Sequence, residues 1–246
     1  MEFIVLTIES TASTNDDVKQ AALLGGPEGL VIRAETQRAG RGRRGRVWES
    51  PEGNLYASVL LRPPFPPRDY GKVSFAAVLA VGEALDSYLP PQAIRLKWPN
   101  DVLVDGKKIS GILLESIEGG LVVGIGINIL RKPEHAQYPA TCLADRGTVA
   151  ISDQTIPAVL NSFLSALDHW YGLLITEGFE PLRTAWIARA QKGTLRVRIK
   201  DADIEGVFLD LDSDGSLYLR SPEGTEHRII AGAGDVLANE QGFSSA

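Results

Sequence analysis

Apolar positions along this chain follow two periods, one typical of helices and one typical of strands. Leu30 to Ala34 and Asn54 to Leu61 are short apolar runs that predict buried strands. From Tyr70 to Leu89 the apolar residues recur at helical spacing, and Pro90 ends the pattern. Ser13 precedes an earlier helical segment as a capping residue.

The middle of the chain predicts a meander of strands. Ile94 to Trp98 and Val102 to Val104 are apolar runs, and Asp105-Gly106 is a hairpin turn signal. Lys108 to Glu115 and Leu121 to Ile129 continue the meander. Together with the helices, this order predicts an α+β fold, with a mixed, antiparallel-rich sheet and flanking helices.

Two further helical segments, at about Thr155 to Ile175 and Phe179 to Ala190, precede a change of character. After Gly193 the chain contains only short apolar runs separated by turn residues. This pattern predicts a small C-terminal β-barrel with its own core. We expect two domains, residues 1–191 and 192–246.

Composition narrows the class of protein. The 246 residues carry 25 Lys and Arg against 31 Asp and Glu, a net charge of −6, which disfavours a broad DNA-binding face. No apolar run approaches the roughly 20 residues of a membrane span, and the N-terminus lacks a basic signal-peptide region, so we expect a cytoplasmic protein. Cys142 is the single cysteine and is expected to pack as a small apolar side chain. The three histidines lack metal-ligand spacing.

The segment Gly40 to Arg46 interleaves four arginines with three glycines in an otherwise acidic chain. It matches the letters of the dinucleotide fingerprint, but a strand-like run follows it where that fingerprint requires a helix. Guanidinium groups grip phosphate or carboxylate oxygens, and glycines allow close approach and mobility. We therefore predict a mobile anion-binding loop, disordered without ligand; a solvated loop or an RNA-binding segment is the alternative.

Lys97 to Asp101 places a cation, an aromatic ring, a proline break and a carboxylate between two strands. A simple turn would explain Pro99 and Asn100 but would explain Lys97 and Trp98 poorly. Beside lysines, the Asp101 carboxylate would suit Mg²⁺ on phosphate oxygens.

Lysines and glycines on the last two strands of the meander complete the pattern. Only one of Lys107 and Lys108 can face a given site, because neighbouring strand residues point to opposite faces. Gly111, Gly124 and Gly126 would leave a flat floor for a ligand. Tight packing against a helix is the alternative explanation for the last two glycines.

These segments, in this order, resemble the biotin protein ligase family. The matching text is Ser13-Thr14-Asn15, Glu35 to Ala39 leading into Gly40 to Arg46 and Trp48, Lys97 to Asp101, Lys108 to Glu115, Gly124 to Asn128, and Ala233 to Val236.

The resemblance implies a core like that of class II aminoacyl-tRNA synthetases, followed by an SH3-like barrel. It also implies that biotin and ATP form biotinyl-5′-adenylate with Mg²⁺, and that the biotinyl group passes to a lysine of a biotin carboxyl carrier protein domain. Ser13 comes so early that we expect a form without an N-terminal DNA-binding domain. An exposed strand beside the site could support a homodimer or dock the carrier. A lipoate ligase or octanoyl transferase, or a non-catalytic Arg-Gly RNA-binding module, is the alternative.

The resemblance also implies roles for individual residues. Arg43, Lys108 and Asp101 would be catalytic, with Asp101 also a Mg²⁺ ligand. The biotin site would comprise Ser13, Thr14, Asn15, Gln37, Gly40, Arg41, Gly42, Arg43, Lys108, Gly111, Gly124 and Gly126. The ATP site would comprise Arg41, Arg43, Arg46, Trp48, Lys97, Asn100, Asp101, Lys108 and Asn128.

Overall fold

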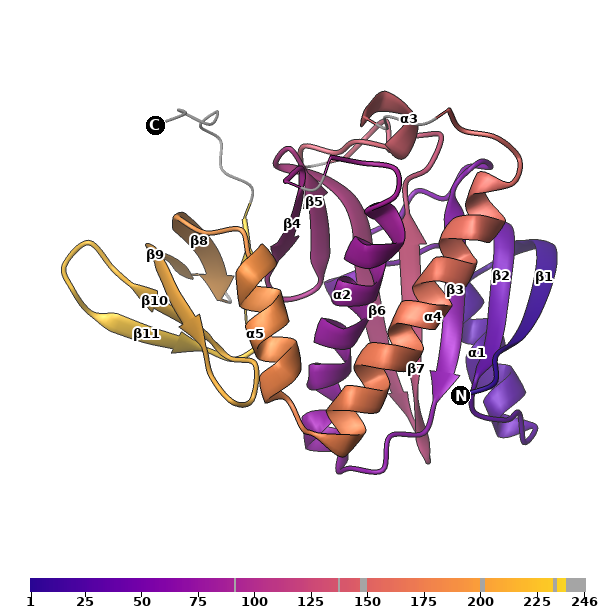
Figure 1. The fold of residues 1–246 in the computed structure, drawn as a ribbon, viewed down its shortest axis with the longest axis horizontal. Coiled ribbons are helices and arrows are strands. Elements are labelled where there is room, and N and C mark those ends of the chain that lie inside the picture. Colours follow the sequence, from indigo (N-terminus) through magenta and orange to yellow (C-terminus); the bar gives the residue numbers. More distant parts are fainter. Residues whose placement is uncertain (91, 137, 147–149, 200–201, 232–233, 238–246) are drawn as a thin grey trace.

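A seven-stranded mixed sheet forms the body of the molecule, in a computed structural model that describes residues 1–90, 92–136, 138–146, 150–199, 202–231 and 234–237 (Figure 1). Its strand order is β1-β2-β3-β7-β6-β5-β4. The strands are β1 Ile4–Thr11, β2 Leu30–Gln37, β3 Leu55–Leu61, β4 Ile94–Lys97, β5 Asp101–Val104, β6 Lys107–Ile117 and β7 Gly120–Ile127. β1 runs parallel to β2 and the other neighbours are antiparallel, which confirms the predicted mixed sheet.

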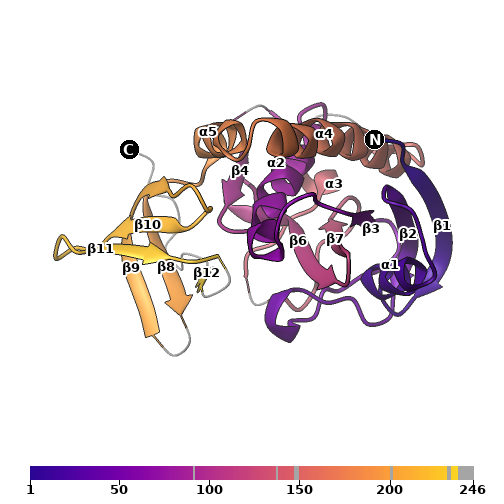
Figure 2. The same ribbon diagram turned by 90° about the horizontal axis from the view of Figure 1, so that it is seen from below.

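Helices cover both faces of this sheet. Figure 2 shows α2 (Val73–Leu85) and α4 (Thr155–Thr176) on one face and α1 (Thr14–Leu23) on the other. α2 is apolar and buried on nearly every side because the sheet, α4 and α5 (Glu180–Arg189) surround it. It is shorter than predicted, since a 3-10 turn at Pro67–Lys72 precedes it. No described helix has the length and apolarity that would let it cross a bilayer.

Side chains of the central strands point alternately to the two faces of the sheet, and the two faces differ in character. In β7, Val123 and Ile125 belong to the large apolar core beneath α2 and α4. Gly124 and Gly126 face the opposite side of the sheet, and so does Ser58 of β3. One face of the sheet therefore stabilises the fold, and the other carries small and polar residues beside α1.

The C-terminal strands form a second, antiparallel sheet with the order β11-β10-β9-β8-β12. They are β8 Thr194–Ile199, β9 Ala202–Leu211, β10 Leu217–Arg220, β11 Glu226–Ile229 and β12 Gly234–Val236. Among the described residues β11 and β12 are not paired, so the sheet is open there. The sheet lies beyond α5, at the end of the molecule away from β1 (Figure 1).

The C-terminal sheet lacks the separate core that its sequence predicts. Its buried residues belong to the same apolar cluster as α2 and α5. Trp186 of α5 joins the two parts, with its ring 5.7 Å from that of Phe75 and 6.2 Å from that of Phe208. The two sheets therefore share one core.

Trp98 also joins the two parts. It is 2% exposed, and its Nε1 donates a hydrogen bond to the carbonyl oxygen of Gly215, 2.9 Å away, between β9 and β10. A cis peptide bond links Trp98 to Pro99. A simple turn left Trp98 unexplained, and the structure gives the reason for its burial outside the turn, because a tryptophan can be buried where its N–H finds an acceptor. This anchor ties the segment between β4 and β5 to the turn between β9 and β10.

Candidate active site

A cavity of about 1080 Å³ opens on the face of the sheet that carries the glycines. The cavity brings together nearly all of the predicted site residues: Ser13, Thr14, Asn15, Gln37, Arg41, Gly42, Arg43, Arg46, Trp48, Lys97, Asn100, Asp101, Lys108, Gly111, Gly124, Gly126 and Asn128. Gly40 is the exception: it is buried and does not line the cavity. An added Cβ there would meet Ser50 Oγ and the Trp48 carbonyl oxygen at 2.5 Å, so the path of the loop leaves no room for a side chain at Gly40.

The start of α1 forms one end of the cavity, where its polar side chains bond to one another. Gln37 Oε1 accepts from the backbone N–H of Thr14 at 2.9 Å and from its hydroxyl at 3.1 Å. Ser58 Oγ donates to Asn15 Oδ1 at 2.6 Å and lies 2.7 Å from Thr14 Oγ1. Ser13, Thr14 and Asn15 are each 3% exposed. Such a preordered polar group suits a small ligand with several hydrogen-bonding atoms.

The glycine floor exists, but protein side chains lie on it. An added Cβ at Gly124 would stand 2.2 Å from Asn15 Oδ1, and one at Gly126 would stand 2.5 Å from the Trp48 indole. The alternative explanation, packing against a helix, holds for Gly124, whereas the predicted ligand floor stays a prediction. Asn15 of α1 packs on Gly124, while Trp48 lies on Gly126.

The Gly40 to Arg46 loop has a defined path across the cavity, and we call it the flap. Its two ends pair, since Trp48 N donates to the Gly40 carbonyl at 2.9 Å and Gly42 N to the Arg46 carbonyl at 2.7 Å. A 3-10 turn at Arg43–Gly45 forms its tip. Mobility without ligand stays a prediction.

Arginines of the flap reach different partners. The Arg41 guanidinium hydrogen-bonds Asp16 and Glu115 beside α1. Arg43 extends the other way: it donates to Asn100 Oδ1 at 3.4 Å and to the carbonyl oxygen of Ala231, in the C-terminal part, at 2.6 Å. The flap therefore touches both ends of the cavity.

Lys108 lies at the centre of the site. Its Nζ is 2.7 Å from Asp101 Oδ1, and the rings of Trp48 and Tyr138 lie 5.4 Å and 5.0 Å from it. Burial raises the pKa of the Tyr138 phenol, although the Lys108 charge opposes that shift. The ammonium group is thus held by a carboxylate and two aromatic rings, beside the floor on which a ligand would lie.

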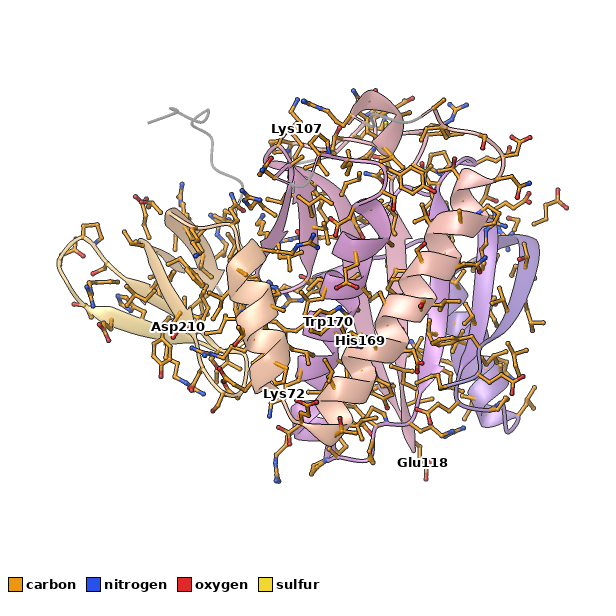
Figure 3. The ribbon with its side chains drawn as sticks, viewed as in Figure 1. Lys72, Lys107, Glu118, His169, Trp170 and Asp210 are labelled. Carbon is orange, nitrogen blue, oxygen red and sulfur yellow. The ribbon has the colours of Figure 1, made fainter. Side chains whose placement is uncertain are left out.

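A β-bulge decides which way Lys108 faces. Val102 pairs with Ser110 and Leu103 with Lys108, so Ile109 is an extra residue in β6. The bulge brings Lys108 and Gly111, three positions apart, to the same face: an added Cβ at Gly111 would stand 3.2 Å from Lys108 Nζ. Lys107 is exposed at the rim, near the β5–β6 turn (Figure 3).

Asn100, Asp101 and Asn128 line the middle of the cavity. Asn100 Nδ2 donates to the Ile112 carbonyl at 2.5 Å, and Asn128 Nδ2 to the Thr141 carbonyl at 3.0 Å. No cluster of three or more His, Cys, Asp or Glu side chains that could hold a metal occurs in the described residues. Cys142 is buried, as predicted, and burial raises the pKa of its thiol.

Sequence reasoning missed several residues of the cavity wall. Tyr138 lies in an irregular segment without a pattern that would single it out. Gln191 and Arg198 come from the C-terminal side of the chain, and only the fold brings them to the cavity. Ser58 does not line the cavity but holds Thr14 and Asn15, which do, and its place as a lone polar residue within an apolar strand is a signal that could have found it.

Comparison with known proteins agrees with this geometry. The chain matches the Biotin/lipoate A/B protein ligase family over residues 7–130 and the Biotin protein ligase C terminal domain over residues 195–233. The biotin–[acetyl-CoA-carboxylase] ligase of Paracoccus denitrificans is 36% identical over 88% of this chain and 94% of its own length. The Mycobacterium tuberculosis protein of that name is 34% identical over 94% of this chain and 87% of its own length.

A solved structure extends the likeness to the fold. Biotin protein ligase from Aquifex aeolicus, in complex with biotin and ATP, has a TM-score of 0.81 and 26% identity, and the match covers 96% of this chain and 99% of that one. The fold and the matched domains define a carrier-modifying ligase of the biotin/lipoate type. Within that class, this chain belongs to the biotin protein ligases.

Replacing Gly124 with Ala should damage the α1 end of the cavity selectively. The new methyl group would overlap Asn15 Oδ1, so Asn15 must move. We expect the KM for biotin to rise about tenfold, as for loss of one well-placed hydrogen bond to the ligand. Steady-state kinetics would measure this. Gly172→Ala is a matched control, because an added Cβ there meets nothing within 4 Å, and it should leave KM unchanged.

Proposed function

We propose that this protein joins biotin to a lysine of a biotin carboxyl carrier protein domain, in two steps driven by ATP. The observation that carries the proposal is a single cavity that unites a buried polar pocket at α1, an arginine-rich flap and the Lys108–Asp101 pair. The biotin–[acetyl-CoA-carboxylase] ligases at 36% and 34% identity support it, as does the related Aquifex enzyme that holds biotin and ATP.

In the first step, a biotin carboxylate oxygen attacks the α-phosphorus of ATP. A P–O bond forms to the carboxylate while the bond to the β-phosphate bridging oxygen breaks, releasing pyrophosphate. Both reactants are anions, so fixed cations at the point of contact lower the barrier. Lys108, at the centre of the cavity, and Arg43 and Arg46 of the flap supply those cations.

In the second step, a lysine amine of the carrier attacks the carbonyl carbon of the adenylate. The C–N bond forms, the bond from carbonyl carbon to phosphate oxygen breaks, and AMP leaves while the amine loses its proton. The adenylate reacts readily with water, so a closed flap protects it until the carrier arrives.

For the nucleotide, we propose that Trp48 stacks on adenine and that Asn128 contributes to its recognition. Trp48 Nε1 is buried without a hydrogen-bond partner among the described residues, which supports a ligand or rearrangement at this point. Lys97, Asn100 and Arg46 would contact the phosphates. Gly111 and Gly42 leave room beside the activated carboxylate.

Asp101 is our proposed contact for Mg²⁺. Its side chain is 16% exposed and lines the cavity beside Lys108. Protein Mg²⁺ sites that serve nucleotides often use only one or two carboxylates, with phosphate oxygens and water completing the octahedron. A lone Asp101 therefore fits. When bound, the ion would neutralise charge on the triphosphate.

Partners and finer architecture complete the proposal. β5 pairs with β6 only as far as Gly111. The rest of β6, toward Ile117, therefore has an open edge on which a carrier domain or a second copy of this chain would add a strand. We further propose a class II synthetase-like domain at 1–191, an SH3-like barrel at 192–246 and a cytoplasmic location.

Biotin-dependent exchange of radiolabelled pyrophosphate into ATP tests the proposal. We expect exchange with biotin and Mg²⁺ but none with lipoate or octanoate in its place. Transfer of label to a purified carrier domain should follow. Exchange that required lipoate would favour the lipoate ligase alternative, and salt-sensitive RNA binding without exchange would favour the RNA-binding alternative.

A further inference from the structure

Arg41 is already fully engaged by the protein. Its Nη1 and Nη2 donate to the two oxygens of Asp16 at 2.7 and 2.6 Å, and Nη2 also donates to Glu115 at 3.0 Å. Lys19 Nζ completes the group 2.7 Å from Glu115 Oε1. Two cations and two carboxylates thus balance, and we call Asp16, Lys19, Arg41 and Glu115 the Arg41 latch. The guanidinium faces α1 and not the Lys97–Asp101 end.

The carboxylates of the latch are held in their charged form. Hydrogen bonding to Arg41 lowers the pKa of Asp16. Burial opposes ionisation of Glu115, but hydrogen bonds from Lys19, Asn15 and Arg41 overcome it and lower its pKa. The latch is therefore intact at neutral pH and would weaken only in acid, as pH falls through these lowered values.

Glu115 has a second connection, into the cavity. Its Oε2 accepts a hydrogen bond from Asn15 Nδ2 at 2.5 Å. Because Ser58 donates to the other end of that amide, the orientation of Asn15 is fixed at both ends. The Asp16 carboxylate instead bonds to Arg41 and Lys19. The two carboxylates of the latch therefore differ in one respect: Glu115 alone touches both the flap and Asn15.

The far end of the flap is tied to the same polar group. Thr14 donates to Gln37, Gln37 Nε2 donates to Ser50 Oγ at 3.0 Å, and Ser50 Oγ donates to the Trp48 carbonyl at 3.0 Å. Both ends of the flap are thus joined to side chains at the start of α1. Small shifts in that pocket have a direct route to the flap.

We infer that Glu115 is a positioning residue that couples the flap to the biotin pocket, and that Arg41 serves as the latch of the flap rather than as an ATP ligand. This rests on the proposed function, because biotin is taken to occupy the pocket at Asn15. Glu115 orients the Asn15 amide for the ligand and holds Arg41 at the base of the flap. Filling the pocket and closing the flap therefore depend on one carboxylate.

Two isosteric variants separate these roles. Asp16→Asn weakens the hold on Arg41 and the long contact with Lys19 but leaves the Glu115–Asn15 bond in place, so trypsin should cut the flap at least about fivefold faster, while calorimetry gives a biotin Kd within about twofold of wild type. Glu115→Gln weakens both contacts, so flap cleavage should accelerate and the biotin Kd should rise about tenfold. Neither change alters the trypsin sites. Asp145→Asn is the control, because it removes a carboxylate that pairs with Lys132 away from the flap. It should change neither the rate of flap cleavage nor the biotin Kd.

The outcomes discriminate sharply. Equal biotin Kd values for Glu115→Gln and wild type would overturn the coupling, as would an unchanged rate of flap cleavage. A tenfold change in Kd for Asp16→Asn would overturn the special role of Glu115. Melting temperatures of all variants check folding, and Glu115→Asp, which keeps the charge, should partly restore flap protection. Absence of biotin-dependent exchange in the wild type would refute the proposed function, whereas the cleavage rates report on the latch independently.

Discussion

Lys108→Ala should reduce biotin-dependent pyrophosphate exchange by about 10²–10³-fold, the usual effect of removing one group that stabilises developing charge. Lys108 is the ammonium at the centre of the cavity, between Asp101, Trp48 and Tyr138. Its loss leaves two anionic reactants facing each other and removes the partner of Asp101. The effect should fall mainly on the chemical step, so single-turnover rates of adenylate formation should drop more than ATP affinity.

A folding defect must be separated from this loss. Removing Lys108 leaves the Asp101 carboxylate, which is only 16% exposed, without its ion-pair partner. We expect this loss to destabilise the fold by about 1–3 kcal/mol. Urea unfolding of the variant and of the wild type measures that difference in the free energy of unfolding. Lys107→Ala is the matched control, because Lys107 is the neighbouring exposed lysine at the rim (Figure 3), and its exchange rate should stay within about threefold of wild type. Near-normal exchange in Lys108→Ala would contradict a catalytic role.

Much of this site could be read from the sequence because its local patterns have local causes. Asp105-Gly106 predicted a hairpin turn, and both residues adopt positive φ angles, 47° and 74°, between β5 and β6. The alternation of glycines and isoleucines in β7 predicted a strand with one stripped face. The residue types of the flap and of Lys97 to Asp101 predicted anion chemistry, and the cavity unites them.

What the sequence did not predict depends on contacts between distant segments. Trp98 is an anchor because Gly215, 117 positions away, supplies an acceptor. The bulge at Ile109, which turns Lys108 toward Gly111, follows from the register with β5. Glu115 lies 74 positions from Arg41, and no local spacing indicates that they meet. The shared core, likewise, needs α5 and the C-terminal sheet in place before it can be recognised.

Arg43→Gly should release the adenylate from the enzyme and raise the KM for biotin or ATP about 10–100-fold. Arg43 is the residue through which the flap reaches Asn100 and the Ala231 carbonyl, so its loss removes the anchor at the C-terminal end of the cavity while the Arg41 latch remains. A flap held only at the α1 end of the cavity should still bind biotin but should no longer exclude water. Chromatography of the reaction without carrier would measure free biotinyl-adenylate in solution.

Arg44→Gly is the control that isolates this effect from loop charge. It removes one positive charge from the same flap at an exposed position that does not line the cavity, and glycine accepts the positive φ angle of 56° found there. If free adenylate accumulates equally in both variants, net charge and not the Arg43 contact holds the flap. If it accumulates in neither, the flap does not retain the intermediate. Accumulation in Arg43→Gly alone is the result expected, because closure depends on contacts at both ends of the cavity.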